Sequence, residues 1–139
     1  GFQIGLHTAG MLPKALDTLL PDIDWVGLDI KAPRAVYQRI TGSPGSGEAA
    51  FASLGLLMSS GKSFEVRTTW HPALLDAAEL IALAGELAAA GAGQWALQAF
   101  RPAGCDDASL VAAGPAVFPP DLLPGLRAAA PGLTITSRE

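Results

Sequence analysis

The sequence predicts an α/β fold built on a parallel β-sheet. Short apolar segments typical of strands alternate with segments that have helical spacing, and these units follow one another at intervals of roughly 30 residues. The segment at residues 25–30 is continuously apolar, as expected for a parallel strand that is covered on both faces. Polar side chains follow the ends of the strand segments, where barrels of parallel strands carry their active sites. The sheet is either open and doubly wound or part of a barrel.

The handedness of the connections favours the barrel if the strands lie in sequential order. Connections between parallel strands are right-handed in about 98% of cases. All the helices would then lie on one face of the sheet, the outer face of a barrel wall.

Two strands and one helix are predicted in the first part of the chain. Residues 2–7 are expected to form a short buried strand, and residues 12–20 a helix that ends at Pro21 and Asp22. Residues 25–30 form the second strand. The apolar face of the helix consists of Leu12, Leu16, Leu19 and Leu20.

The middle of the chain predicts a loop, a helix and a third strand. Residues 41–47 are rich in Gly, Ser and Pro, and residues 48–60 have helical spacing with Gly61 as the C-cap. Residues 64–70 alternate like a strand, which Pro72 stops because proline cannot donate to the ladder. The apolar helix positions are Phe51, Leu54, Leu57 and Met58.

The last part of the chain repeats the pattern. Residues 76–90 form the clearest helix, with Leu80, Leu83 and Leu87 on one face, and residues 94–100 form the fourth strand. A last short helix is predicted from Asp121 to Ala130. Residues 133–136 are expected to form a terminal strand.

Composition narrows the classes of function. The chain has 139 residues, and we expect residues 1–139 to form a single domain. The net charge of -4 is spread along the chain without a cluster of Lys and Arg, so nucleic acid is not an expected partner. No apolar run approaches the roughly 20 residues that span a bilayer, and we expect neither a secretory signal nor a membrane partner. A cytoplasmic protein is expected.

Metal and thiol chemistry finds little support in the sequence. One cysteine, Cys105, excludes an internal disulfide and an all-cysteine iron–sulfur site built by this chain alone, and we interpret it as a loop thiol. His7 and His71 follow strands but lack an identifiable third ligand, so no metal site is predicted. The Gly-rich residues 42–47 lack the Gly-Lys-Ser/Thr ending of a phosphate-binding loop and are interpreted as a flexible loop.

Asp29 and Lys31 end the second strand. Because they are two residues apart, they are expected to face the same way, where carboxylate and ammonium could pair with each other or meet a ligand. A structural salt bridge at the rim, or a lysine that has left the strand for solvent, is the alternative.

Arg67 and Thr69 share one face of the third strand. An arginine on an interior strand is costly unless it meets an anion, so a ligand carboxylate or phosphate is expected there. Pairing with Glu65 is a structural alternative, which we expect the alternation of strand faces to disfavour. Asp29 is a second structural partner that could pair with Arg67 in place of a ligand.

The strand ends together resemble those of the radical S-adenosylmethionine activating enzymes, in the same order and over nearly the whole chain. Leu-His-Thr-Ala-Gly at residues 6–10 is similar to the family's Leu-Asp-Thr-Asn-Gly, and Leu-Asp-Ile-Lys at residues 28–31 to its Leu-Asp-hydrophobic-Lys strand. Three further segments resemble those that follow in the family, namely Tyr37 with Ile-Thr-Gly at residues 40–42, residues 64–69 with Pro72, and residues 96–101.

The resemblance is strongest to the activating proteins of anaerobic ribonucleotide reductase and pyruvate formate-lyase. It implies the C-terminal part of a partial (β/α)6 barrel. The family binds a [4Fe–4S] cluster and S-adenosylmethionine, whose reductive cleavage gives a 5′-deoxyadenosyl radical. That radical abstracts hydrogen from a glycine of a partner, a glycyl-radical enzyme.

The same resemblance implies a set of ligand-binding side chains. Lys31 and Arg67 would meet the methionine carboxylate, Asp29 would accept hydrogen bonds from the ribose or balance the sulfonium, and Gln98 and Arg101 would close the rim. No residue is assigned a catalytic role. The full set of residues carried over to the pocket for S-adenosylmethionine or the target loop is Thr8, Asp29, Lys31, Arg67, Thr69, Gln98 and Arg101.

Two departures from the family affect what we expect of this chain. The three-cysteine cluster motif and a Gly-Gly-Glu segment of the first two strands are absent, and His7 stands where the family has Asp. We therefore expect the C-terminal part of a longer enzyme, inactive alone, with an exposed sheet edge that pairs with further strands or forms a homodimer. Two other functions stay open, a Schiff-base aldolase with Lys31 as the amine nucleophile and a non-catalytic binding or assembly module.

Overall fold

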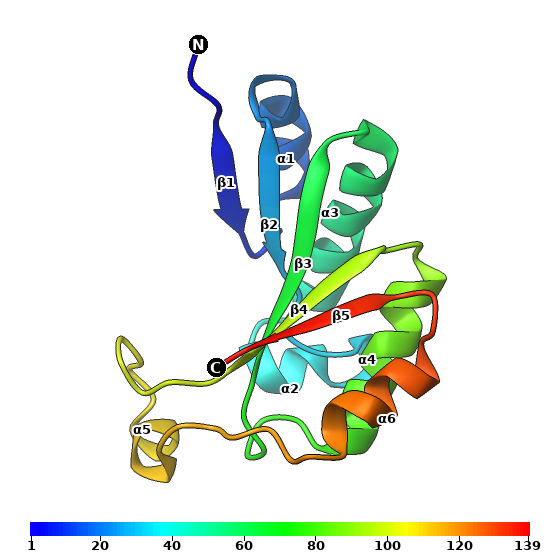
Figure 1. Cartoon of the computed structure of the whole chain (residues 1–139). Helices are drawn as coiled ribbons and strands as arrows, with labels where there is room; N and C mark the ends of the chain where they lie inside the picture. The colour runs from blue at the N-terminus through cyan, green and yellow to red at the C-terminus, as the bar shows by residue number, and fades with distance from the viewer.

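Five strands form one fully parallel sheet whose spatial order is the order in sequence (Figure 1). This computed structural model describes all residues, 1–139. The predicted α/β class with a parallel sheet is confirmed. The strands are β1 (Gly5–Thr8), β2 (Trp25–Asp29), β3 (Ser63–Trp70), β4 (Gln94–Ala99) and β5 (Thr134–Arg138).

Most of the helices cover one face of the sheet, as the right-handed connections of a sequential sheet require. Figure 1 shows α1, α3, α4 and α6 on that side, while α5 lies beyond the carboxyl end of β4. The helices are α1 (Pro13–Leu19), α2 (Tyr37–Thr41), α3 (Ser46–Ser60), α4 (Ala77–Ala89), α5 (Ala108–Ala113) and α6 (Leu122–Ala129), with 3-10 turns η1 (Leu20–Asp22) and η2 (Arg34–Val36). No helix combines the length and apolar character needed to cross a membrane.

The hydrophobic core lies between the helices and one face of the sheet. Alternate strand residues point into it and are fully buried, for example Val26, Leu28 and Val66. The leucines predicted on α4 are buried against them. The intervening residues face the other side, where this chain places no helix. Val26, Gly27 and Leu28 are nevertheless buried in succession, so the prediction that this strand is covered on both faces is confirmed for its centre.

The first strand also differs from its prediction. β1 is shorter than residues 2–7 and is not buried, because it is an edge strand that pairs with β2 alone. Phe2 and Ile4 precede it with 102% and 52% of their surface exposed.

Helix α1 packs through only part of its predicted face. Leu16 and Leu20 are buried, whereas Leu12 and Leu19 are exposed, because α1 lies at the end of the helical layer with a neighbour on one side only. The chain continues past α1 into η1, whose first turn accepts Pro21 because that position needs no backbone donor.

Two short helices were missed. α2 extends into the first residue of the loop predicted at residues 41–47, and α5 lies in a segment for which no element was predicted. The predicted loop is also shorter at its other end, because α3 begins at Ser46. With five and six residues, α2 and α5 are too short to show an apolar period. The predicted C-cap at Gly61 is confirmed, since this residue has φ 71° and ends α3.

Candidate functional site

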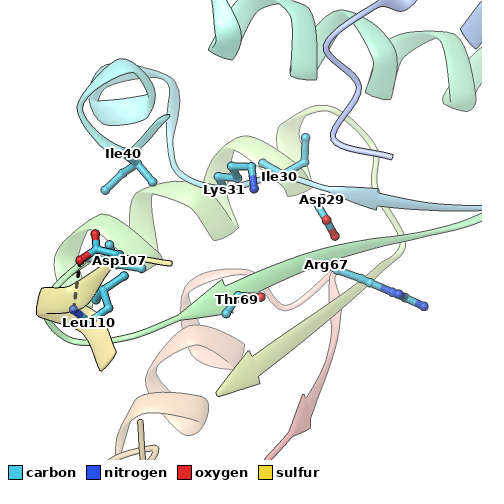
Figure 2. Close-up of a pocket in the computed structure, with 9 residues that line it drawn as sticks. Asp29, Ile30, Lys31, Ile40, Arg67, Thr69, Asp107 and Leu110 are labelled. Carbon is cyan, nitrogen blue, oxygen red and sulfur yellow. Dashed lines mark hydrogen bonds between the residues drawn. The ribbon is translucent and has the colours of Figure 1, made fainter. Parts of the chain in front are cut away.

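A pocket of about 240 Å³ lies at the carboxyl ends of β2 and β3 (Figure 2). Its polar side chains come from two neighbouring strand ends and from the start of α5. Its apolar wall comes from the segments that surround these ends. The lining residues are Asp29, Ile30, Lys31, Ile40, Arg67, Thr69, Leu74, Asp107 and Leu110. The expectation that polar strand ends meet at one rim is therefore confirmed for β2 and β3.

The backbone that carries Asp29 and Lys31 is fixed by hydrogen bonds on each side of Ile30. The Ile30 amide donates to the Arg67 carbonyl at 2.9 Å, and the Thr68 hydroxyl donates to the Ile30 carbonyl at 2.6 Å. The Lys31 amide donates to the Tyr37 hydroxyl at 3.0 Å. Since Ile30 is fully buried between the two, the backbone that carries both charged side chains is held at the pocket, while the side chains themselves are exposed.

Tyr37 supports this segment from the core. Its side chain is almost completely buried and packs edge-on against Phe51. Burial raises the pKa of Tyr37, and the nearby charge of Asp29 acts in the same direction, while the hydrogen bond from the Lys31 amide opposes them.

The pocket contains charged groups that no other side chain neutralises. The ion pairs of the protein within 4.0 Å are Arg39 with Glu79, and Glu65 with both Arg67 and Arg138. Asp29, Lys31 and Asp107 take part in none of them. The predicted pairing of Asp29 with Lys31 is therefore not formed, and neither is a structural salt bridge at the rim. Lys31 lies beyond the end of β2 and is exposed, which agrees with the alternative of a lysine that has left the strand for solvent.

Arg67 lies beside the pocket but points its guanidinium away from it, as Figure 2 shows. Its Nε donates to Glu65 at 3.0 Å, and its Nη1 lies 2.8 Å from His7 Nδ1. The guanidinium also lies over the Trp25 ring, at 5.2 Å from the ring centroid. The expectation that strand alternation disfavours Glu65 was wrong, because residues 65 and 67 are two apart and share a face.

Asp29 and Arg67 are register partners on adjacent strands, yet they form no ion pair. Asp29 therefore does not pair with Arg67, which pairs with Glu65 instead. The negative charge of Asp29 stays available at the pocket.

The remaining predicted site residues lie outside this pocket. Thr8 is opposite Leu28 in the ladder and so faces the helices, where its hydroxyl accepts from the Gly10 amide at 3.0 Å. Gln98 is exposed on the open face of β4, opposite Thr69. Arg101 donates to the backbone carbonyl of Glu139. The structure thus brings Asp29, Lys31, Arg67 and Thr69 together, and not the other three.

Asp107 is a pocket residue that sequence reasoning missed. It is the N-cap of α5, and its Oδ1 accepts from the Ser109 hydroxyl at 2.6 Å and the Leu110 amide at 3.2 Å. These hydrogen bonds, the Ser109 hydroxyl first, hold the pKa of Asp107 below its usual range. An Asp followed by Ser two residues later is a capping signal, but without a periodic helix it could not be interpreted.

The two histidines and the cysteine do not form a common site. His71 is buried, and its Nδ1 accepts from the Ala73 amide at 3.0 Å, whereas His7 is exposed and contacts Arg67. Cys105 is a free thiol in the loop between β4 and α5. No three His, Cys, Asp or Glu side chains are grouped to hold a metal ion.

Comparison with known proteins adds a structural likeness. No protein-family model matches the sequence, and no curated protein matches it. The structure is similar to a domain of pyruvate-formate lyase-activating enzyme from Bacteroides vulgatus ATCC 8482, with a TM-score of 0.72 and 13% sequence identity over 100% of this chain and 83% of that one. At this identity the likeness defines the fold, an α/β domain with a parallel sheet that is shared with an activating enzyme.

Proposed function

We propose that this chain is the C-terminal part of a radical S-adenosylmethionine activating enzyme and that its pocket binds S-adenosylmethionine. The observation that carries the proposal is a set of unpaired charges, Asp29 and Lys31, fixed at the carboxyl ends of parallel strands. Ligands of open parallel sheets bind at that edge. The sequence motifs at the strand ends and the fold shared with an activating enzyme support the same assignment.

The residues of the pocket fit the chemistry of S-adenosylmethionine. The Lys31 ammonium suits the methionine carboxylate, and the Asp29 carboxylate suits the ribose hydroxyls or the sulfonium. Thr69 offers a hydroxyl beside them. The pocket is smaller than the roughly 300–1,000 Å³ typical of sites that enclose a drug-sized ligand, so it would hold part of the molecule. The open face that carries Gln98 would extend the site.

The [4Fe–4S] cluster is a different case, because this chain does not supply its ligands. Such a cluster is held by several cysteine thiolates, and the chain has one. We propose that residues outside residues 1–139 bind it, in strands that pair with the free edge of β1. A cluster held by those residues would supply the electron for the cleavage of S-adenosylmethionine. The partner would be a glycyl-radical enzyme.

Calorimetric titration with S-adenosylmethionine tests the binding function. We expect the chain to bind the nucleoside and Lys31→Ala to weaken binding about tenfold, because a charge-assisted hydrogen bond to the carboxylate is lost. Lys62→Ala removes the same charge from the opposite end of the sheet, before β3, and is expected to bind like the wild type. Equal affinity of the two variants, or no binding by the wild type, would contradict the assignment.

The Schiff-base alternative has less support in the structure. An amine nucleophile of that kind is activated by a desolvated pocket or a neighbouring cation. Lys31 is exposed, and Arg67, the other cation among the residues that line the pocket, is engaged by Glu65. Borohydride treatment with a carbonyl compound is expected to leave Lys31 unmodified, and a stable adduct there would favour the aldolase.

A further inference from the structure

Asp107 brings a second carboxylate to the pocket from outside the sheet. It begins α5, in the connection between β4 and α6, and Leu110 of the same helix forms part of the pocket wall. Figure 2 shows Asp107 and Asp29 well apart along the pocket, with Lys31 drawn between them. The two acidic groups therefore act on different parts of a bound ligand.

Capping of α5 uses only one of the two carboxylate oxygens. Oδ1 of Asp107 accepts from the Ser109 amide at 2.9 Å, the Ser109 hydroxyl at 2.6 Å and the Leu110 amide at 3.2 Å. Oδ2 accepts no hydrogen bond from the protein. The hydrogen bonds to Oδ1 lower the pKa of Asp107, so the group is ionised at neutral pH, with Oδ2 free for a ligand.

The charge balance of the pocket depends on this residue. Asp29 and Asp107 are negative and Lys31 is positive, and none of them has an ion-pair partner, whereas Arg67 points away from the pocket and pairs with Glu65, which also pairs with Arg138. Among the unpaired side chains of the pocket, the negative charges thus outnumber the positive ones by one. A concave site with an excess charge of one sign favours ligands of the opposite sign.

We propose that Asp107 determines the charge specificity of the pocket, favouring a sulfonium nucleoside over its neutral thioether counterpart. S-adenosylmethionine has two cationic groups and one carboxylate, whereas S-adenosylhomocysteine lacks the sulfonium charge. The proposal rests on the proposed function, since it assumes that the pocket binds the nucleoside. Without Asp107, Asp29 is the one unpaired carboxylate left at the pocket, and the preference falls.

The test compares the two nucleosides on matched variants. Asp107→Asn removes the charge and keeps a residue that caps helices well. Asp106→Asn changes the net charge equally at a neighbouring residue that does not line the pocket. Dissociation constants for S-adenosylmethionine and S-adenosylhomocysteine are measured by calorimetry. We expect the preference for the sulfonium to fall about two- to fivefold in Asp107→Asn and to stay unchanged in Asp106→Asn.

The outcomes separate this proposal from the proposed function. An unchanged preference in Asp107→Asn, or an equal fall in both variants, overturns the role of Asp107 and leaves nucleoside binding standing. Failure of the wild type to bind either nucleoside overturns the proposed function and this role with it. In the wild type alone, added salt must reduce the preference, and a salt-independent preference also overturns the proposal.

Discussion

Tyr37 connects the candidate site to the core through a single hydroxyl. This hydroxyl accepts a hydrogen bond from the Lys31 amide at 3.0 Å, and the Tyr37 side chain is almost fully buried. Tyr37 is the only tyrosine of the chain, so its titration can be observed directly. Because burial raises the pKa of Tyr37, ionisation of this phenol at alkaline pH is expected to lower the free energy of unfolding.

The absorbance of tyrosinate is expected to appear at higher pH in the folded protein than in urea. Because the folded-state pKa of Tyr37 is raised above 10.0, its contribution to stability is present below pH 10.0 and is lost as the pH rises through the folded pKa. Urea unfolding should show a smaller alkaline loss of stability for Tyr37→Phe than for the wild type. Equal losses, or coincident titration in folded and unfolded protein, would show that burial does not protect the phenol.

Among the elements, α4 has the strongest local signals. Asp76 accepts from the Glu79 amide at 2.8 Å, and the Glu79 carboxylate accepts from the Asp76 amide at 3.0 Å, which together form a capping box. Glu79 also pairs with Arg39 of α2 at 2.6 Å. The start of α4 is thereby tied to the short helix that follows the Lys31 segment.

Loss of this cap should cost measurable stability. Asp76→Ala is expected to reduce the free energy of unfolding by about 1 kcal/mol, since an amide of the first helical turn loses its acceptor. Asp121→Ala is the matched control, because Asp121 is the N-cap of α6 but makes no side-chain capping hydrogen bond. Urea denaturation measures both variants, and equal losses would mean that the capping box does not stabilise α4.

At the scale of the whole molecule, the sheet has a free edge at β1. This strand pairs with β2 alone, and exposed apolar side chains, Ile4 and Leu12 among them, lie near it. An unpaired strand edge beside apolar surface is a site for pairing with another chain. We therefore propose that two copies of this chain associate through β1 when no other strand covers it.

Sedimentation velocity over a range of concentrations tests this association. We expect the wild type to form dimers as concentration rises and Ile4→Lys to remain monomeric, because a charge beside the edge opposes pairing. Ile81→Lys places the same charge on α4, at a side chain of comparable exposure, 43% against 52%, and should leave the dimer intact. A wild type that is monomeric at every concentration would contradict the proposal.

Long and regular elements were predicted from sequence patterns, and short helices were not. α3, α4 and all five strands follow from apolar spacing and their stop signals, whereas α2 and α5 are too short to show a period. The exposure of β1 and Leu12 depends on which elements lie at the end of the layers, which no local pattern contains.

The site was predictable only where strand alternation determines it. The positions of Asp29 and Thr69 follow from strand ends and register, whereas Lys31 lies beyond the end of β2 and its amide donates to Tyr37. Asp107 reaches the pocket through a long connection, and the direction of the Arg67 guanidinium depends on Glu65 and His7. These are tertiary relations between segments far apart in the chain.

We propose that S-adenosylmethionine binds at the carboxyl ends of β2 and β3. Backbone amide NMR during titration with the nucleoside locates the site directly. We expect saturable shifts at Lys31, Thr69 and Leu110, with the amides of β1 unaffected. Shifts confined to β1 and α1, or no shifts at the strand ends while the ligand binds, would contradict it.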